Sequence, residues 1–192
     1  MKLPDKIITE RLVLKVNKKA TFELARKLYE VTVQSQDTLA EWLPPLGKIH
    51  SPEDDFPFLL ECQKNRKEKI EFHYLITEKK TKKILGSIAL INISDENKSS
   101  EIGYWLSNEA VGHGYVQESV HALEDEAFQR GINRIVIRNN TKNLRSVRVA
   151  ERCGYILEGV MRQDRWDTYH QRWRDSNIFS KLKSDWEKQK KR

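Results

Sequence analysis

The sequence predicts an α/β domain in which a mixed β-sheet is flanked by α-helices. Its length of 192 residues suits one domain and would be cramped for two. Segments with the alternating pattern of strands are interspersed with segments whose apolar residues recur at helical spacing. With 5 Trp, 6 Tyr and 6 Phe the chain can build a core, although 33% of its residues are charged.

The first third of the chain is predicted to form one strand and three helices. Ile7 to Val16 alternates like a strand, and Lys18 to about Val33 has helical spacing. A short helix around Asp37 to Trp42 is stopped by two prolines. A Ser-Pro-Glu-Asp run then resembles a helix N-terminus. Pro57 disagrees with so early a start, so we expect regular helix only from Asp55 to Glu68.

The middle of the chain predicts three strands followed by a long helix. The strands are Glu71 to Thr77, Ile84 to Ser94 and Ser100 to Leu106, separated by polar turns. Val116 to Gln129 carries its apolar residues on one face, and Gly131 closes this helix.

The last third of the chain predicts a strand, a helix and two further strands. Arg134 to Arg138 is a short apolar strand, and a helix spans Asn143 to Cys153. Tyr155 to Met161 and about Tyr169 to Leu182 follow as strands. The basic residues 187–192 are expected to form a solvated tail.

Charge and cysteine content limit the class of protein. The 35 Lys and Arg against 28 Asp and Glu give a net charge of +7, which favours acidic partners without identifying one. No apolar stretch approaches the ~18 residues that span a membrane, and the first residues lack the apolar core of a signal peptide. Cys62 and Cys153 cannot form a disulfide framework, and no metal-ligand spacing is present. We therefore expect a cytoplasmic protein with no membrane association and no metal.

Two glycines stand in the turn before the clearest helix, at Gly112 and Gly114. A helix start offers about four backbone N–H groups without internal partners, and glycines allow a phosphate to approach them. The turn lacks both the Walker lysine and the third glycine of a dinucleotide fingerprint. Two glycines in a strand-to-helix turn are also compatible with turn geometry alone.

A serine lies on an apolar helix face downstream. Ser146 shares its face with Val149, Ala150 and Cys153. Its hydroxyl either bonds back to the preceding turn or points into a cleft, because a serine in apolar surroundings must find a hydrogen bond.

Taken in order, five segments resemble the RimJ/RimL branch of the GNAT N-acetyltransferases. They are Ile8-Thr9-Glu10-Arg11-Leu12, Glu101-Ile102-Gly103-Tyr104-Trp105, Val111-Gly112-His113-Gly114-Tyr115, Asn143-x-x-Ser146 and Gly154-Tyr155-Ile156-Leu157-Glu158-Gly159. The resemblance runs from about residue 8 to about residue 186. It implies one GNAT-like domain with a mixed, mostly antiparallel sheet of about seven strands and about four helices.

The resemblance also implies acetyl-CoA as co-substrate and assigns residues to it. In this family the turn before the helix holds the pyrophosphate, and the preceding strand pairs with the pantetheine arm. The residues implied to bind acetyl-CoA are Tyr104, Trp105, Leu106, Val111, Gly112, His113, Gly114, Tyr115, Val116, Asn143 and Ser146. One departure is Glu109, which stands where the family motif has Gln or Arg. We expect acetyl-CoA to bind despite Glu109, because the backbone amides contribute most of the binding of the phosphates.

Three side chains are candidates for the chemistry of acetyl transfer. Ser146 would donate a hydrogen bond to the departing thiolate, and a strand N–H near Leu106 would stabilise the oxyanion. Glu101 is the first candidate for the base that takes the amine proton, although an ordinary salt bridge explains it equally well. Glu41 is the second candidate for this base; alternatively, its carboxylate binds the ammonium group of the substrate.

The implied acceptor is a primary amine, and the branch favours the N-terminal α-amine of a ribosomal-type protein. A small-molecule amine is the nearest alternative. A non-catalytic protein that binds RNA is another, because Arg and Trp interleave in the segments Arg162 to Trp166 and Arg172 to Arg174. The intact glycine turn and Asn143-x-x-Ser146 argue against this last reading. The family also makes a homodimer plausible.

Overall fold

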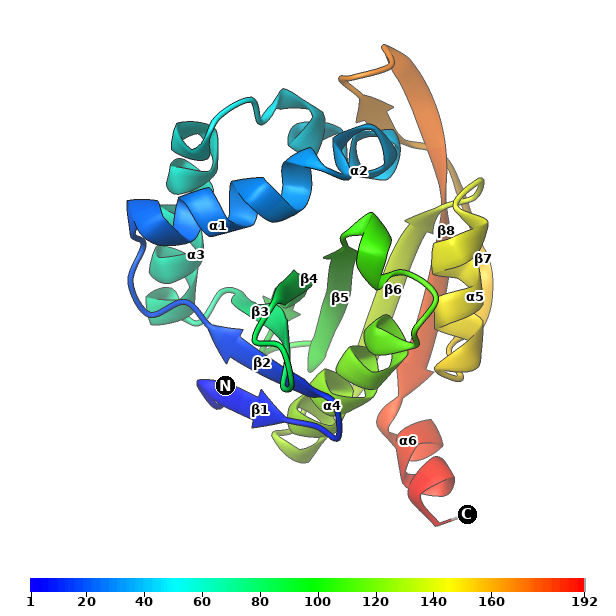
Figure 1. Cartoon of the computed structure of the whole chain (residues 1–192). Helices are drawn as coiled ribbons and strands as arrows, with labels where there is room; N and C mark the ends of the chain where they lie inside the picture. The colour runs from blue at the N-terminus through cyan, green and yellow to red at the C-terminus, as the bar shows by residue number, and fades with distance from the viewer. Residues whose placement is uncertain (192) are drawn as a thin grey trace.

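An eight-stranded sheet in the order β1-β2-β3-β4-β5-β6-β8-β7 organises residues 1–191, which the computed structural model describes (Figure 1). The strands are β1 (Lys6–Ile8), β2 (Leu12–Val16), β3 (Phe72–Glu78), β4 (Ile84–Ser94), β5 (Ser99–Leu106), β6 (Arg134–Asn140), β7 (Ile156–Asp167) and β8 (Arg172–Leu182). Neighbouring strands are antiparallel except β5 and β6, which are parallel. The predicted fold class, a mixed and mostly antiparallel sheet with flanking helices, is confirmed.

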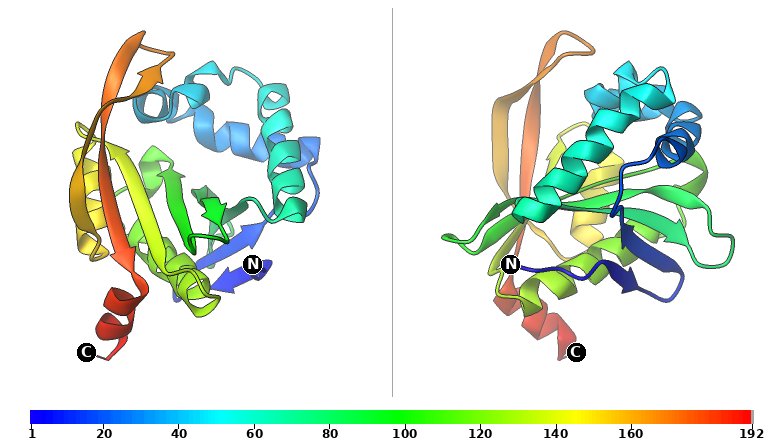
Figure 2. Two further views of the ribbon diagram at one scale, coloured as in Figure 1. Left: turned by 180° about the vertical axis from the view of Figure 1, so that it is seen from behind. Right: turned by 90° about the vertical axis from the view of Figure 1, so that its left-hand side faces the viewer.

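The helices are α1 (Phe22–Val33), α2 (Gln36–Trp42), α3 (Pro52–Glu68), α4 (Tyr115–Gln129), α5 (Leu144–Arg152) and α6 (Lys183–Lys190), with short 3-10 turns η1 (Pro44–Lys48) and η2 (Asn108–Ala110). Helices α1 and α3 lie on one side of the sheet and α4 on the other (Figures 1 and 2). No helix among residues 1–191 combines the length and the apolar character that a membrane crossing requires.

Strand β5 separates two apolar clusters because its side chains alternate between the two faces of the sheet. Ile102, Tyr104 and Leu106 pack on the α4 side, in the main core. Trp105 packs on the other side with Leu28 of α1 and its neighbours. Glu101 therefore faces the same side as α1 to α3, and Tyr104 faces α4.

The parallel pairing of β5 with β6 is short. It covers only Ser99 to Glu101 against Arg134 to Val136. Beyond that point β5 stays paired with β4 as far as Leu106, and β6 stays paired with β8 as far as Asn140. The two halves of the sheet therefore part after Glu101.

Helix α3 begins three residues before the predicted start, so the expectation based on Pro57 was wrong. Ser51 and Asp54 form a capping box, in which the Asp54 carboxylate accepts the Ser51 N–H at 2.9 Å. Three acids in the first turn also complement the helix dipole. These contacts offset the one backbone hydrogen bond that Pro57 removes inside the helix.

Three other segments differ from the prediction in length or number. Strand β8 begins at Arg172 rather than near Tyr169, because residues 168–171 form the turn of the hairpin. The segment expected to form one strand from Ile7 to Val16 forms a hairpin of β1 and β2. Strand β7 continues to Asp167, six residues beyond its predicted end. The β7–β8 pairing contains two bulges, and β7 continues beyond them although the apolar pattern in its sequence has ended.

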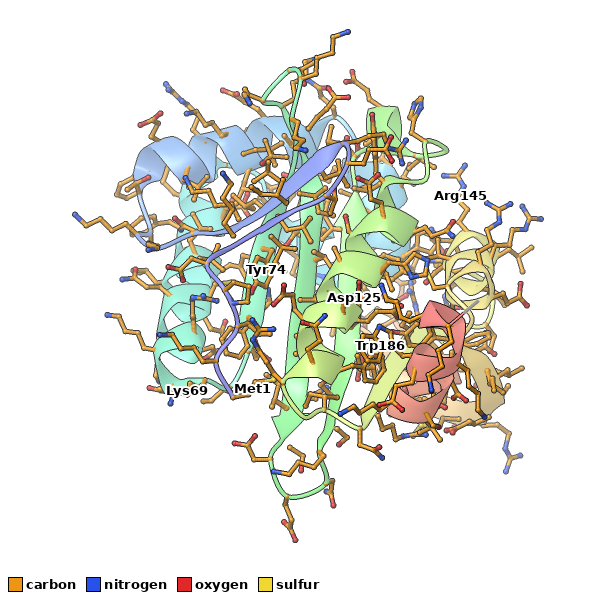
Figure 3. All side chains as sticks on the ribbon, turned by 90° about the horizontal axis from the view of Figure 1, so that it is seen from below. Met1, Lys69, Tyr74, Asp125, Arg145 and Trp186 are labelled. Atoms are coloured by element: carbon orange, nitrogen blue, oxygen red, sulfur yellow. The ribbon has the colours of Figure 1, made fainter. Side chains whose placement is uncertain are left out.

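Helix α6 covers residues 183–186, for which no element was predicted, and residues 187–190, which were expected to form a tail. The Trp186 indole N–H donates to Asp125 Oδ1 at 2.6 Å, and Figure 3 shows the two side chains together. Lys181 is fully buried, and its Nζ contacts Glu124 Oε1 at 2.8 Å and Gln189 Oε1 at 3.2 Å. These long-range contacts fix α6 against α4, and the run expected as a tail from residue 187 is helical through Lys190.

A buried acid in α3 makes the stability of this fold depend on pH. Asp55 is 3% exposed, and its Oδ2 has no hydrogen-bond partner among residues 1–191. Burial, with a smaller contribution from the charge of Asp54, raises the pKa of Asp55 from 3.8 to about 6. Since the unfolded chain loses this proton near pH 4 and the folded protein holds it to about pH 6, stability falls as the pH rises through that window.

Asp55→Asn is therefore expected to stabilise the protein at pH 7.5 by about 2 kcal/mol and to have much less effect at pH 4. Urea unfolding at the two pH values measures the difference. Glu53→Gln, an exposed acid of the same turn, is the control and should show no such dependence. An equal gain from Asp55→Asn at both pH values would contradict this account.

Candidate active site

A cavity of about 770 Å³ opens where β5 and β6 part. It is lined by both strands, by the turn before α4, by α5, by the α2–η1 segment and by the tip of the β7–β8 hairpin. The predicted site residues that line it are Glu101, Tyr104, Trp105, Leu106, Val111, Gly112, Gly114, Tyr115, Val116, Asn143 and Ser146. The cavity lining does not include His113 or Glu41.

The turn before α4 leaves its backbone amides accessible. Gly112 has φ +90° and Gly114 has φ +76°, values that favour glycine. A Cβ at Gly112 would meet nothing within 4 Å, so open space lies beside the backbone. Because α4 begins at Tyr115, its first N–H groups have no partner within the helix. The turn is thus suited to bind an anion.

Arg11 holds this turn through hydrogen bonds, which the sequence did not predict. Its Nη1 donates to the His113 carbonyl at 2.8 Å and its Nε to Glu118 Oε2 at 2.7 Å. The guanidinium also lies 4.8 Å from the centre of the Tyr115 ring. Arg11 lies within one of the five recognised segments, yet nothing in the sequence pairs it with a helix over 100 residues away. A Cβ placed at Gly114 would lie 3.5 Å from Arg11 Nη2, so the positive charge of Arg11 is beside the turn.

Glu109 lies away from the cavity. Its side chain is exposed on η2 and does not line the cavity. The acid in the first turn of α4, Glu118, is instead engaged by Arg11. Burial opposes ionisation of Glu118, but hydrogen bonds from Thr9 and Arg11 outweigh it and lower the pKa of this carboxyl. The Glu118 carboxylate is therefore neutralised locally.

Ser146 and Tyr104 meet across the cavity. Their hydroxyl oxygens are 2.9 Å apart, and Asn143 caps α5 by accepting the Ser146 N–H at 3.1 Å. Of the two arrangements considered from sequence alone, the structure favours the second: Ser146 lines the cavity, and its hydroxyl bonds to a strand residue rather than to the preceding turn. Burial raises the pKa of Tyr104. A neutral Tyr104 can donate to Ser146, which leaves the serine proton free to point into the cavity.

Glu101 is buried on the α1–α3 side of β5. It is 7% exposed and accepts a hydrogen bond at 3.1 Å from Asn92, at the bulge of β4. Arg138 and Arg165 approach it without hydrogen bonds, at 3.7 and 3.9 Å. The carboxylate therefore keeps acceptor capacity toward the cavity.

Glu41 takes part in a different group of charges. It accepts from Arg172 Nη2 at 3.1 Å and lies 2.9 Å from His170 Nε2. Asp167, buried beneath, lies 2.8 Å from the other ring nitrogen of His170. Although burial acts against it, the hydrogen bonds of His170 and the charge of Arg174 hold the pKa of Asp167 at about 2. The group joins α2 to the β7–β8 hairpin, and the Glu41 carboxylate is occupied.

Neither cysteine is suited to nucleophilic chemistry. Burial raises the pKa of Cys62 and of Cys153 to about 12, so both thiols stay protonated and act as packing groups. Among residues 1–191 no group of three or more His, Cys, Asp or Glu side chains is placed to hold a metal ion.

The profile described as an acetyltransferase (GNAT) domain matches residues 18–156, and the chain belongs to this family. The chain is 34% identical over 106 residues to the ribosomal-protein-serine acetyltransferase of Escherichia coli, covering 54% of this chain and 57% of that protein. It is 29% identical over 188 residues to YdaF of Bacillus subtilis, named as a candidate ribosomal N-acetyltransferase, covering 92% and 98% of the two chains.

A solved structure extends the similarity to the fold. The Microcin C7 self immunity acetyltransferase MccE, determined in complex with acetyl-CoA and AMP, superposes with a TM-score of 0.82 at 25% identity. The superposition covers 90% of this chain and 93% of that one.

Proposed function

We propose that this GNAT acetyltransferase transfers the acetyl group of acetyl-CoA directly to the N-terminal α-amine of a protein. The observation that carries the proposal is one continuous cavity with an anion-binding helix start at one end and the buried Glu101 carboxylate at the other. The serine hydroxyl of Ser146 lies between them.

The cavity fits acetyl-CoA on three grounds. The amides of residues 112–117 would hold the pyrophosphate. Helix α5 adds three exposed arginines to the lining, Arg145, Arg148 and Arg152, which suit further phosphate. Tyr104 to Leu106 lie on the edge of β5 that β6 has left, so their backbone can pair with the amides of the pantetheine arm.

The side chains then have separate parts in the reaction. The thioester supplies an activated acetyl group. Glu101 takes a proton from the ammonium of the acceptor so that the free amine can attack. Backbone N–H groups of β5 stabilise the oxyanion, and Ser146 donates a hydrogen bond to the thiolate as it leaves. The second proton, which the attacking nitrogen loses as the amide forms, neutralises that thiolate. Tyr104 supports this step by donating to Ser146, so the serine proton stays directed at the sulfur.

The proposed acceptor rests on the relatives. Both curated relatives described above carry ribosomal acetyltransferase names. The similarity to MccE, a self immunity enzyme for Microcin C7, favours a small-molecule amine as the second candidate. Mass spectrometry of reactions with N-terminal peptides and with small amines separates the two. Acetylation of small amines alone would overturn the protein acceptor.

Ser146→Ala is expected to lower kcat by about 10- to 100-fold, because the thiolate loses its hydrogen bond. The Kd for acetyl-CoA should change by no more than about twofold, since the phosphates hold most of the ligand. Quenched-reaction assays measure kcat, and calorimetric titration measures the Kd for acetyl-CoA. Ser184→Ala, an exposed serine of α6, serves as the control. Unchanged turnover would remove Ser146 from the chemistry.

Gly112→Val is expected to raise the Kd for acetyl-CoA by at least about tenfold, because a branched side chain is strained at this φ and fills the space beside the amides. Calorimetric titration measures the effect, and Gly112→Ala should give a smaller one. Gly159→Val tests the same exchange at an exposed position of β7 outside the cavity lining. Wild-type affinity in Gly112→Val would refute the placement of the pyrophosphate.

A further inference from the structure

The guanidinium of Arg165 makes no hydrogen bond within residues 1–191, although it lies at the cavity. Arg165 belongs to β7, lines the cavity and has a side chain that is 59% exposed. Its two closest acidic atoms are Asp164 Oδ2 at 3.7 Å from Nε and Glu101 Oε1 at 3.9 Å from Nη2. Both distances exceed those of charge-assisted hydrogen bonds, which are about 2.7–2.9 Å.

Arg138 shares the same two carboxylates; it donates long hydrogen bonds to Asp164 and none to Glu101. Its Nη1 lies 3.3 Å from Asp164 Oδ2, its Nη2 lies 3.7 Å from Glu101 Oε2, and its buried Nε has no partner within the described part of the chain. Two guanidiniums thus face two carboxylates, with N–H donors left over. By contrast, the Arg174–Asp167 pair nearby is in direct contact and buried.

This cluster lies at the acceptor end of the cavity rather than at the phosphate end. Glu101 precedes Leu106 by five residues of β5, a separation of about 16 Å along the strand. The turn with Gly112 follows Leu106, so Arg165 at Glu101 is remote from the amides that would hold the pyrophosphate. The tip of the β7–β8 hairpin and Trp42 of α2 also line the cavity.

We propose that Arg165 binds an acidic side chain of the acceptor, close to the amine that is acetylated. This inference rests on the proposed function and specifies its substrate class: peptides with Glu or Asp directly after the first residue. The acceptor carboxylate would accept hydrogen bonds from the Arg165 guanidinium, which within the protein has only the two distant contacts with Asp164 and Glu101. As Arg165 turns toward that carboxylate, it leaves Glu101 Oε1, which is then free to accept the amine proton.

The test compares three peptides that begin with Ala and continue with Glu-Glu, Gln-Gln or Lys-Lys, in otherwise identical sequences. The wild-type enzyme should favour the Glu peptide over the Gln peptide by about tenfold in kcat/KM, as a charge-assisted hydrogen bond implies. Arg165→Gln should remove this preference without altering the Kd for acetyl-CoA, and Arg165→Glu should favour the Lys peptide. Arg162→Gln makes the same exchange at an exposed residue of β7 outside the cavity lining and should keep the wild-type preference.

The outcomes separate this inference from the function on which it rests. Acetylation of all three peptides at equal rates, or a preference that persists in Arg165→Gln, overturns the role of Arg165 and leaves peptide acetylation intact. No transfer to any peptide, with acetyl-CoA bound, contradicts the peptide acceptor itself and the inference with it. Equal loss of preference in Arg162→Gln would show that general surface charge, not Arg165, attracts acidic peptides.

Discussion

The cleft depends on the point at which β5 and β6 stop pairing. Each strand keeps its other neighbour, β4 and β8 respectively, so the sheet divides into two stable halves that part after Glu101 and Val136. The backbone edge of β5 that is exposed by this division can pair with an extended ligand. Ser146 on α5 reaches Tyr104 on β5 because α5 and the Tyr104 side chain pack on the same side of the sheet.

The two ends of the cleft have different electrostatic character. At the α4 end, unpartnered amides and arginines gather, and Glu118 is neutralised by Arg11, so the local field suits phosphates. At the opposite end carboxylates and guanidiniums are mixed, and they differ in how tightly they are paired. Asp167 and Glu41 are engaged in contacts that hold the β7–β8 hairpin, whereas Glu101 is approached only loosely by arginine. This difference in pairing favours Glu101 over Glu41 for the proposed role of proton acceptor.

Most of the fold and many of the candidate site residues could be predicted from local sequence patterns. The glycine turn, the helix after it and Asn143-x-x-Ser146 were predictable because each depends on residues within one or two helical turns. Contacts between distant residues were not: the bond of Tyr104 to Ser146, Arg11 beside the α4 turn and Glu41 with His170 join segments far apart in sequence. Helix α6 was missed for the same reason, since its Trp186 and Gln189 bond to Asp125 of α4 and to buried Lys181 of β8, which lie outside the helix. At Pro57 the local rule itself misled, because a capping box compensated for the proline.

Amide hydrogen exchange with and without acetyl-CoA would locate the ligand along the backbone. We expect saturable binding that slows exchange in residues 102–106 of β5 and in residues 112–117 before and within the first turn of α4. Exchange in β1 to β3 should stay as it is in the free protein. Binding that leaves both predicted segments unprotected, or that protects the outer surface of β7 instead, would contradict the cleft between β5 and β6 as the acetyl-CoA site.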